Sequence, residues 1–159
     1  MKTITKKSVI KKELNSCFSS LEDGGLTDFV SEFKNRLLDH KVKFPLLEYC
    51  GLEIYDKIPK KNHIELCDMI ESLKTEGGNV IIGIILKIRL SDYFQESTEK
   101  AVEYISKTDE WYVPDIIGER VFGWALLHHP EIHFSFTENL SSTKINGWCD
   151  PWELELTMP

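Results

Sequence analysis

Apolar residues recur with helical spacing through the first half of the chain. Between residues 26 and 37, Leu and Phe with one Val stand at i, i+3, i+4, i+7 and i+11, which predicts one face of an amphipathic helix. A second helix is predicted from Phe44 to Ile58, because Pro45 suits a first helical turn and Pro59 ends the pattern.

A third helix is predicted to begin at Asn62, a capping residue with Glu65 three positions on, and to end before the Gly77-Gly78 pair. The next stretch, NVIIGIILKIRL at residues 79–90, is ambiguous, since its β-branched residues fit a buried strand equally well. No partner strand is evident elsewhere in the sequence, so we interpret it as a helix in a central layer.

Two further helices are predicted, one capped by Ser97 and one opened by Pro114 and ending before Pro130. About six helices in antiparallel pairs predict an all-α fold of stacked helical hairpins, an α-solenoid. No strict sequence period is visible, so any repeats are structural rather than literal.

The two ends of the chain differ from this helical region, which we place at residues 26–130. Residues 1–25 are rich in Lys and Ser, and five of the first twelve residues are lysines with no acid among them. We expect a basic N-terminal arm there, either mobile or weakly helical. Residues 131–159 form an irregular polar tail without a recognisable period.

The composition indicates a single globular domain, with 159 residues, 42% hydrophobic and 28% charged. The net charge of -7 is unfavourable for a phosphate backbone, but residues 1–79 carry 13 basic and 13 acidic residues, so the excess acid lies in the second half. The longest apolar run, Val80–Leu86, is too short to span a bilayer, and no apolar leader opens the chain. We therefore expect a cytoplasmic protein that does not insert into membranes.

No cofactor or metal site is expected from the motifs. The four cysteines lie far apart without zinc spacing, which favours buried thiols. His128, His129 and His133 have no second ligand pair at helical spacing, and we interpret them as ordinary histidines at a helix end. No glycine pattern typical of a nucleotide phosphate loop is present.

One segment, DEWYVPD at residues 109–115, carries candidate chemistry. It places Trp111 and Tyr112 just before a predicted helix and Asp115 in the first turn. A purely structural interpretation is available, since an acid in a first turn complements the helix dipole and a tryptophan fills gaps between hairpins.

The run DEWYVPDIIGERVFGWALL, together with KFPLLEYCGLEIYDKIP and EGGNVIIGIIL, resembles the DNA alkylation repair family, the AlkD-like glycosylases built from HEAT-like repeats. The resemblance covers about residues 26–130. It implies double-stranded DNA with alkylated purines as partner and metal-free excision of cationic bases such as N3-methyladenine and N7-methylguanine. Trp111 would pack against the lesion, Asp115 would stabilise positive charge on the deoxyribose, and Tyr112 and Arg120 would contact nucleic acid.

The sequence departs from this family after Pro130. Family members continue through further repeats that supply an arginine, whereas Asn146–Asp150 stands at that place here with an acid at the arginine position. Reading the nucleotides behind Trp148 and Cys149 two bases along gives a valine codon and allows an arginine codon, so one hypothesis is an out-of-frame tail. The alternative is a natural short paralogue with its own tail.

Two functions follow from these observations. The first is the excision of alkylated purines from DNA by a glycosylase. The sequence leaves open whether this shortened form keeps that activity. The second is a non-catalytic α-solenoid that binds a protein or a nucleic acid. A shortened stack also exposes an apolar end face, which predicts a homodimer through the C-terminal end of the stack.

Overall fold

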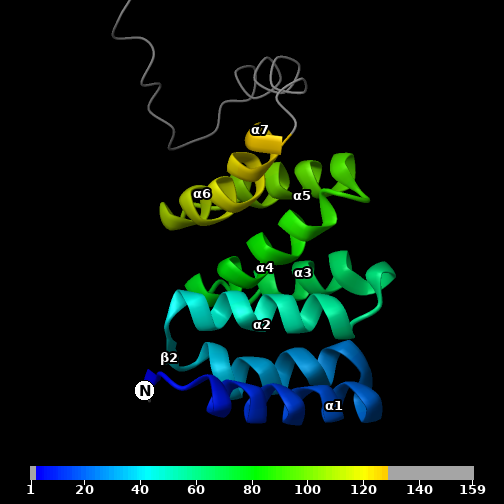
Figure 1. Cartoon of the computed structure of the whole chain (residues 1–159), viewed down its shortest axis with the longest axis vertical. Helices are drawn as coiled ribbons and strands as arrows, with labels where there is room; N and C mark the ends of the chain where they lie inside the picture. Colours follow the sequence, from blue (N-terminus) through cyan, green and yellow to red (C-terminus); the bar gives the residue numbers. More distant parts are fainter. Residues whose placement is uncertain (1–2, 129–159) are drawn as a thin grey trace, which may run out of the picture.

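The computed structural model describes residues 3–128, and these residues are almost entirely helical (Figure 1). Two short strands, β1 (Thr3–Ile4) and β2 (Lys41–Val42), pair in parallel, with Thr3 opposite Lys41. The all-α prediction is confirmed, while the HEAT-like assignment stays a prediction. The helical elements are α1 (Lys7–Phe33), η1 (Lys34–Leu38), α2 (Phe44–Lys57), η2 (Lys60–Asn62), α3 (His63–Glu71), α4 (Glu76–Arg89), α5 (Phe94–Ser106), α6 (Tyr112–Ile117), η3 (Gly118–Gly123) and α7 (Trp124–His128).

Residues 7–24, which belong to the segment that we expected to be a mobile or weakly helical basic arm, are helical and pack onto the other helices. Gly25 has φ 78°, a left-handed conformation that glycine adopts readily, and it divides α1 into two helices. The chain doubles back between the two (Figure 1), and Arg36 Nη1 in η1, which continues the second helix, donates to Glu13 Oε2 in the first at 2.9 Å. Their lysines and serines alternate with an apolar face that is fully covered, formed by Ile10, Leu14, Cys17 and Phe18.

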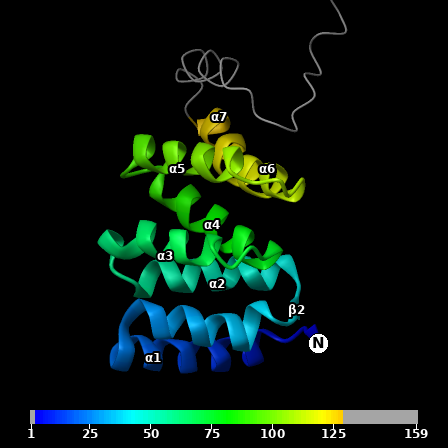
Figure 2. The same cartoon turned by 180° about the vertical axis from the view of Figure 1, so that it is seen from behind.

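The later helices lie in successive layers along the long axis of the molecule (Figures 1 and 2). Helix α4 is central, because it contacts α2, α3, α5 and α6. Helices α2, α4 and α6 begin at residues 44, 76 and 112, and both views show these starts on the same edge of the stack. This edge therefore carries the first turns of three helices that are distant in sequence.

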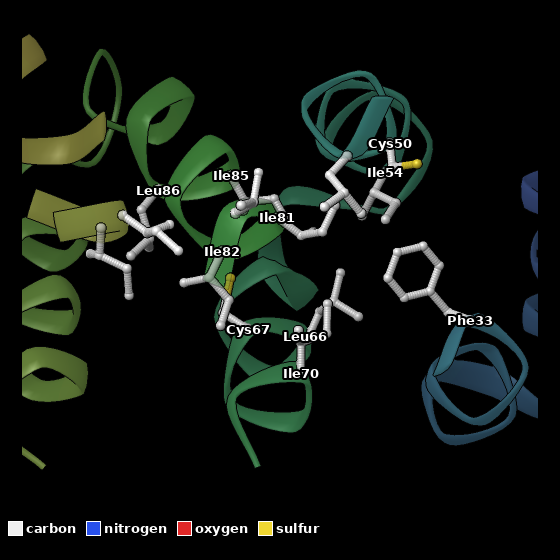
Figure 3. Close-up of a cluster of buried hydrophobic side chains, with 14 of the residues drawn as sticks. Phe33, Cys50, Ile54, Leu66, Cys67, Ile70, Ile81, Ile82, Ile85 and Leu86 are labelled. Carbon is white, nitrogen blue, oxygen red and sulfur yellow. The ribbon is translucent and has the colours of Figure 1, made fainter. Parts of the chain in front are cut away.

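The ambiguous stretch at residues 79–90 is helical. Its side chains are buried nearly all round, because α4 has neighbours on several sides. Figure 3 shows side chains of α4 meeting those of α1, α2 and α3 in one apolar cluster. Such all-round burial explains the lack of a polar face in the sequence. The cluster includes Phe33, Cys50, Ile54, Leu66, Cys67, Ile70, Ile81, Ile82, Ile85 and Leu86.

Two glycines set the spacing between α2, α4 and α6. A Cβ atom on Gly51 would lie 2.9 Å from the Cβ of Ile84, so α2 and α4 approach closely at this point. A Cβ atom on Gly83 would lie 2.8 Å from Cδ of Arg120, so the arginine stem lies directly on α4. These contacts repeat one step along the stack, glycine of one helix against a large side chain of the next.

Two predicted helix boundaries are wrong. Gly77 and Gly78 belong to the first turn of α4 rather than to the end of α3, and Thr75 Oγ1 caps that turn by accepting from Gly78 N at 3.1 Å. Ser97 does not cap α5, which begins at Phe94, and it is buried inside the helix. In both cases the first turn contains residues that a sequence pattern assigns to a connection.

Burial also explains the cysteines within residues 3–128. Cys17, Cys50 and Cys67 are free and buried, as expected. Burial raises the pKa of Cys17 to about 11 and of Cys50 and Cys67 to about 12, so all three are thiols at neutral pH. No helix in this part of the chain combines the length and the apolarity needed to cross a membrane.

Candidate active site

Trp111 and Asp115 are presented together at the start of α6. Trp111 occupies the N-cap position and is 78% exposed, and Asp115 lies in the first turn, four residues later, also exposed. Residues four apart lie on the same helical face, one above the other. The predicted pair is therefore formed by local helix geometry and is open to solvent.

Tyr112 supports the Trp111 ring from the side. The two ring centroids are 5.9 Å apart with an interplanar angle of 84°, an edge-to-face contact, and most of the Trp111 side chain stays exposed beside it. Partial burial raises the pKa of the Tyr112 phenol, and the nearby carboxylates of Glu110 and Glu76 raise it further. Tyr112 is thus a neutral phenol that packs against the Trp111 ring.

The surroundings of Trp111 are acidic. Asp109 and Glu110 precede it and Asp115 follows it. Glu76 lies close enough for its charge to raise the pKa of Tyr112. Within residues 3–128, the Asp115 carboxylate has no hydrogen bond or ion pair. An open indole face beside an unpaired carboxylate is suited to a flat cationic group, since both contacts favour positive charge.

Arg120 lies apart from this pair. It sits in η3, and its Nη2 donates to Glu48 Oε1 of α2 at 2.8 Å while Nη1 donates to Ile116 O at 3.2 Å. Its side chain is 11% exposed. The structure therefore engages Arg120 within the protein, joining α6 to α2 across Gly83, and its contact with nucleic acid stays a prediction.

Sequence reasoning missed Glu48 and Gly83 as partners of Arg120. Gly83 lies within an apolar run and Glu48 is one of 26 acidic residues, so neither stands out in the sequence. Neither carries a local signal, because the three residues come from three helices. Their relationship exists only in the packed structure.

The histidine and tail predictions lie mostly beyond the described residues. His128 stacks on Trp124 at 4.2 Å between ring centroids, and its Nδ1 donates to the Trp124 carbonyl at 2.9 Å. His129, His133 and the segment Asn146–Asp150 lie outside residues 3–128. Within that range no group of three or more His, Cys, Asp or Glu side chains is arranged to hold a metal ion.

A cavity of about 210 Å³ lies at the N-terminal layer, away from Trp111. Its lining mixes apolar and polar side chains: Ile4, Val9, Glu13, Asn35, Arg36 and His40. The Arg36 guanidinium in it is already held by Glu13 at 2.9 Å and by Glu32 at 2.5 Å. The cavity is therefore separate from the candidate chemistry at α6.

Comparison of the chain with protein-family models, with curated proteins and with solved structures gave no match.

Proposed function

We propose that this protein acts in DNA repair by excising cationic N-alkylated purines, such as N3-methyladenine and N7-methylguanine, from double-stranded DNA. The observation that carries the proposal is the joint exposure of Trp111 and Asp115 on one face at the start of α6. The sequence resemblance to DNA alkylation repair glycosylases gives the same pair their roles.

The chemistry required of these residues is modest. An N-alkylated purine carries a positive charge, so its glycosidic bond breaks with the bonding electrons passing to the base, which leaves as a neutral purine. Positive charge then develops on the deoxyribose, and water adds to C1′ with loss of a proton. A carboxylate placed near that charge stabilises the transition state, and no metal ion is needed.

Trp111 and Asp115 divide this work. The indole face attracts a cationic ring by a cation–π contact, which favours an alkylated base over an ordinary one. Asp115 is free of internal partners among residues 3–128, so its negative charge is available to the sugar or to an attacking water. The exposure of both residues fits a substrate held at the surface rather than in a deep pocket.

The decisive experiment measures release of N7-methylguanine from methylated duplex DNA. We expect release by the wild-type protein and at least a 100-fold loss for Asp115→Asn, in line with the loss of one electrostatic group in a transition state. Glu99→Gln, an exposed acid on α5, is the matched control and should retain activity. Wild-type release equal to a protein-free blank rejects the enzymatic proposal.

A second candidate is a non-catalytic helical stack that associates with another copy of itself. The observation in its favour is the exposure of Leu126 and Leu127 on α7, 41% and 81%, at the last layer of the described residues. Paired copies would bury these side chains. Sedimentation equilibrium should then show a dimer that Leu126→Ser with Leu127→Ser converts to monomer, and a wild-type monomer at all concentrations excludes it.

We assign the protein to the cytoplasm, a reducing compartment. The support is the free, buried state of Cys17, Cys50 and Cys67. Cell fractionation with an antibody or tag tests this assignment directly.

A further inference from the structure

A cluster of exposed lysines occupies one corner of the molecule, where the chain begins and α2 starts. Lys6 and Lys7 open α1 directly after β1, and β1 pairs with β2, which contains Lys41 and leads to Lys43 before α2. Figures 1 and 2 both show the N-terminal end beside β2 and the start of α2. We name this cluster the lysine corner, and it comprises Lys6, Lys7, Lys11, Lys12, Lys41 and Lys43.

The lysine corner is electrostatically unbalanced. Among residues 3–128, none of its six lysines has a carboxylate within ion-pair distance, although all six are exposed. The acids of this region are taken by other cations: Glu13 pairs with Arg36, Asp39 with Lys34 and Glu48 with Arg120. The positive charge at the corner is therefore left without internal neutralisation.

Elsewhere in the described chain most lysines are paired. Lys57 pairs with Glu53, Lys60 with Asp92 and Lys100 with Asp68. Lys61 and Lys87 are unpaired, but they belong to η2 and to the last turn of α4, away from the corner. The gathering of unpaired lysines is thus a local feature rather than a property of the whole surface.

One lysine of the corner is held in place. Lys7 Nζ lies 4.1 Å from the ring centroid of Tyr49 in α2, a cation–π contact between the first two layers. This contact keeps the Lys7 charge at the junction of α1 and α2. The corner is therefore partly organised before any partner arrives, which lowers the entropy lost on binding.

The lysine corner lies on the same edge of the stack as Trp111. A Cβ on Gly77, at the start of α4, would contact side chains of Leu38 and Leu47, which flank β2 and the first turn of α2. Glu76, also at the start of α4, lies close enough to Tyr112 of α6 for its negative charge to raise the pKa of the phenol. The first turns of α2, α4 and α6 are therefore neighbours, and the edge runs from the lysines to Trp111.

The acidic surroundings of Trp111 repel phosphates, so a nucleic acid that presents a base to Trp111 needs positive charge at a distance. Neighbouring helices lie about 8–10 Å apart, so the two steps from α2 through α4 place the α2 side of the corner, with Lys41 and Lys43, about 16–20 Å from α6. That span equals about five or six base pairs at about 3.4 Å each.

We propose that the lysine corner binds the phosphate backbone of duplex DNA about five or six base pairs to one side of the base held at Trp111. The inference rests on the proposed function, because it assumes that the base at Trp111 belongs to DNA. It explains the basic N-terminal segment, which the chemistry at α6 leaves without a role.

The test measures binding of unmodified duplex DNA as a function of salt concentration. Each phosphate contact contributes about 0.9 to the slope of log K against log salt. Changing Lys6, Lys7, Lys41 and Lys43 to Gln is expected to reduce that slope by about three to four and to weaken binding at least tenfold in 0.1 M salt. The control changes Lys57, Lys61, Lys87 and Lys107 to Gln, with the same change in net charge, and should bind almost as the wild type does.

A length series adds a geometric test. With a lesion analogue at a fixed position, shortening one flank to fewer than about five base pairs should weaken binding, because it removes the phosphates at the lysine corner, and the same shortening of the other flank should not. The corner variant should be insensitive to both. Circular dichroism shows whether the fourfold Gln variant folds. If it does not, the double variant Lys41→Gln with Lys43→Gln should reduce the slope of log K against log salt by half as much. A variant with Arg at all four positions keeps the charge and should bind duplex DNA as the wild type does.

The outcomes separate this proposal from the proposed function. Lysine-dependent duplex binding without base release keeps the corner and rejects the glycosylase. If the wild type releases the base but the corner and control variants bind duplex DNA equally well, the proposal for the lysine corner is wrong and the proposed glycosylase function stands. If the wild-type protein does not bind duplex DNA, the lysine corner is not a DNA-binding surface. The same conclusion follows if its lysines bind phosphatidylserine vesicles instead of DNA.

Discussion

Arg120 in η3 donates to Glu48 in α2 at 2.8 Å, and its aliphatic stem crosses Gly83 of α4 to reach it. One side chain thus connects three layers of the stack. The guanidinium is largely covered, whereas the Glu48 side chain is 42% exposed. The pair therefore stabilises the layers that position Trp111, even though Arg120 stands close to Trp111 in sequence.

The first prediction concerns Glu48→Gln. The change leaves the covered guanidinium of Arg120 without its charged acceptor, so the free energy of unfolding should fall by about 1–3 kcal/mol. Urea denaturation measures this. Glu53→Gln is the control on the same helix, because its partner Lys57, at 3.8 Å, is 44% exposed and can be solvated by water, so the change should cost less than about 1 kcal/mol. Equal losses in the two variants contradict a special role for the Arg120 pair.

The second prediction separates the two roles considered for Arg120. A lost phosphate contact lowers the salt slope of DNA binding by about one. Because its guanidinium is already engaged, we expect Arg120→Gln to lower stability and to leave that slope unchanged. A slope reduced by one in the folded variant assigns Arg120 to the DNA interface after all.

The third prediction concerns binding of a cationic base at Trp111. N7-methylguanosine should quench the fluorescence of this exposed tryptophan more than guanosine does, and Trp111→Phe should remove the difference. Asp115→Asn should reduce the preference for the cation by about two- to fivefold, the equivalent of about 0.5–1 kcal/mol. Asp109→Asn removes a charge from the preceding loop rather than from the helical face, so its effect should be smaller. An undiminished preference in Asp115→Asn removes the carboxylate from this role.

The fourth prediction compares the same substitution at two glycines. Gly51→Ala forces a Cβ to 2.9 Å from the Cβ of Ile84, so we expect a loss of about 1–3 kcal/mol on unfolding. Gly123→Ala meets no atom within 4 Å, and the better helix propensity of alanine should stabilise by up to about 1 kcal/mol. Thermal unfolding of both variants gives the comparison, and a Gly51→Ala variant as stable as the wild type would show that α2 and α4 are not in close contact.

The fifth prediction is a pH dependence from His63. This side chain is fully buried, with Nε2 2.8 Å from Ile58 O, and burial lowers its pKa from the ordinary 6.5. Below about pH 6.5 the unfolded chain therefore binds a proton at His63, whereas the folded protein binds it only at lower pH. The free energy of unfolding thus decreases as the pH falls through that region. Denaturation at pH 7 and pH 5.5 should show a smaller decrease for His63→Phe than for the wild type, and identical decreases would remove His63 as the cause.

Local patterns predicted much of the helical content. The apolar spacing over residues 26–37 and 44–58 depends only on the period of an α-helix, and the structure has helices over both. The same reasoning located the candidate site. Trp111 and Asp115 are four residues apart, and any helix beginning there places them on one face.

Helix boundaries and the N-terminal layer depended on packing. Gly77 and Gly78 signal a helix end by propensity, yet Thr75 caps a helix that starts through them. Residues 7–24 look like a solvated basic segment until the apolar face of Ile10 and Leu14 is covered by the helix that follows Gly25. Propensity is a small energy that burial overrides.

The sequence by itself determined the helical class and the Trp111–Asp115 pair, because both depend on neighbours within one or two turns. Only the tertiary structure decided that Arg120 pairs with Glu48 and that lysines from two separate segments meet at one corner. These features join residues that are far apart in the chain. Their energies come from burial and charge neutralisation, which arise only once the layers are packed.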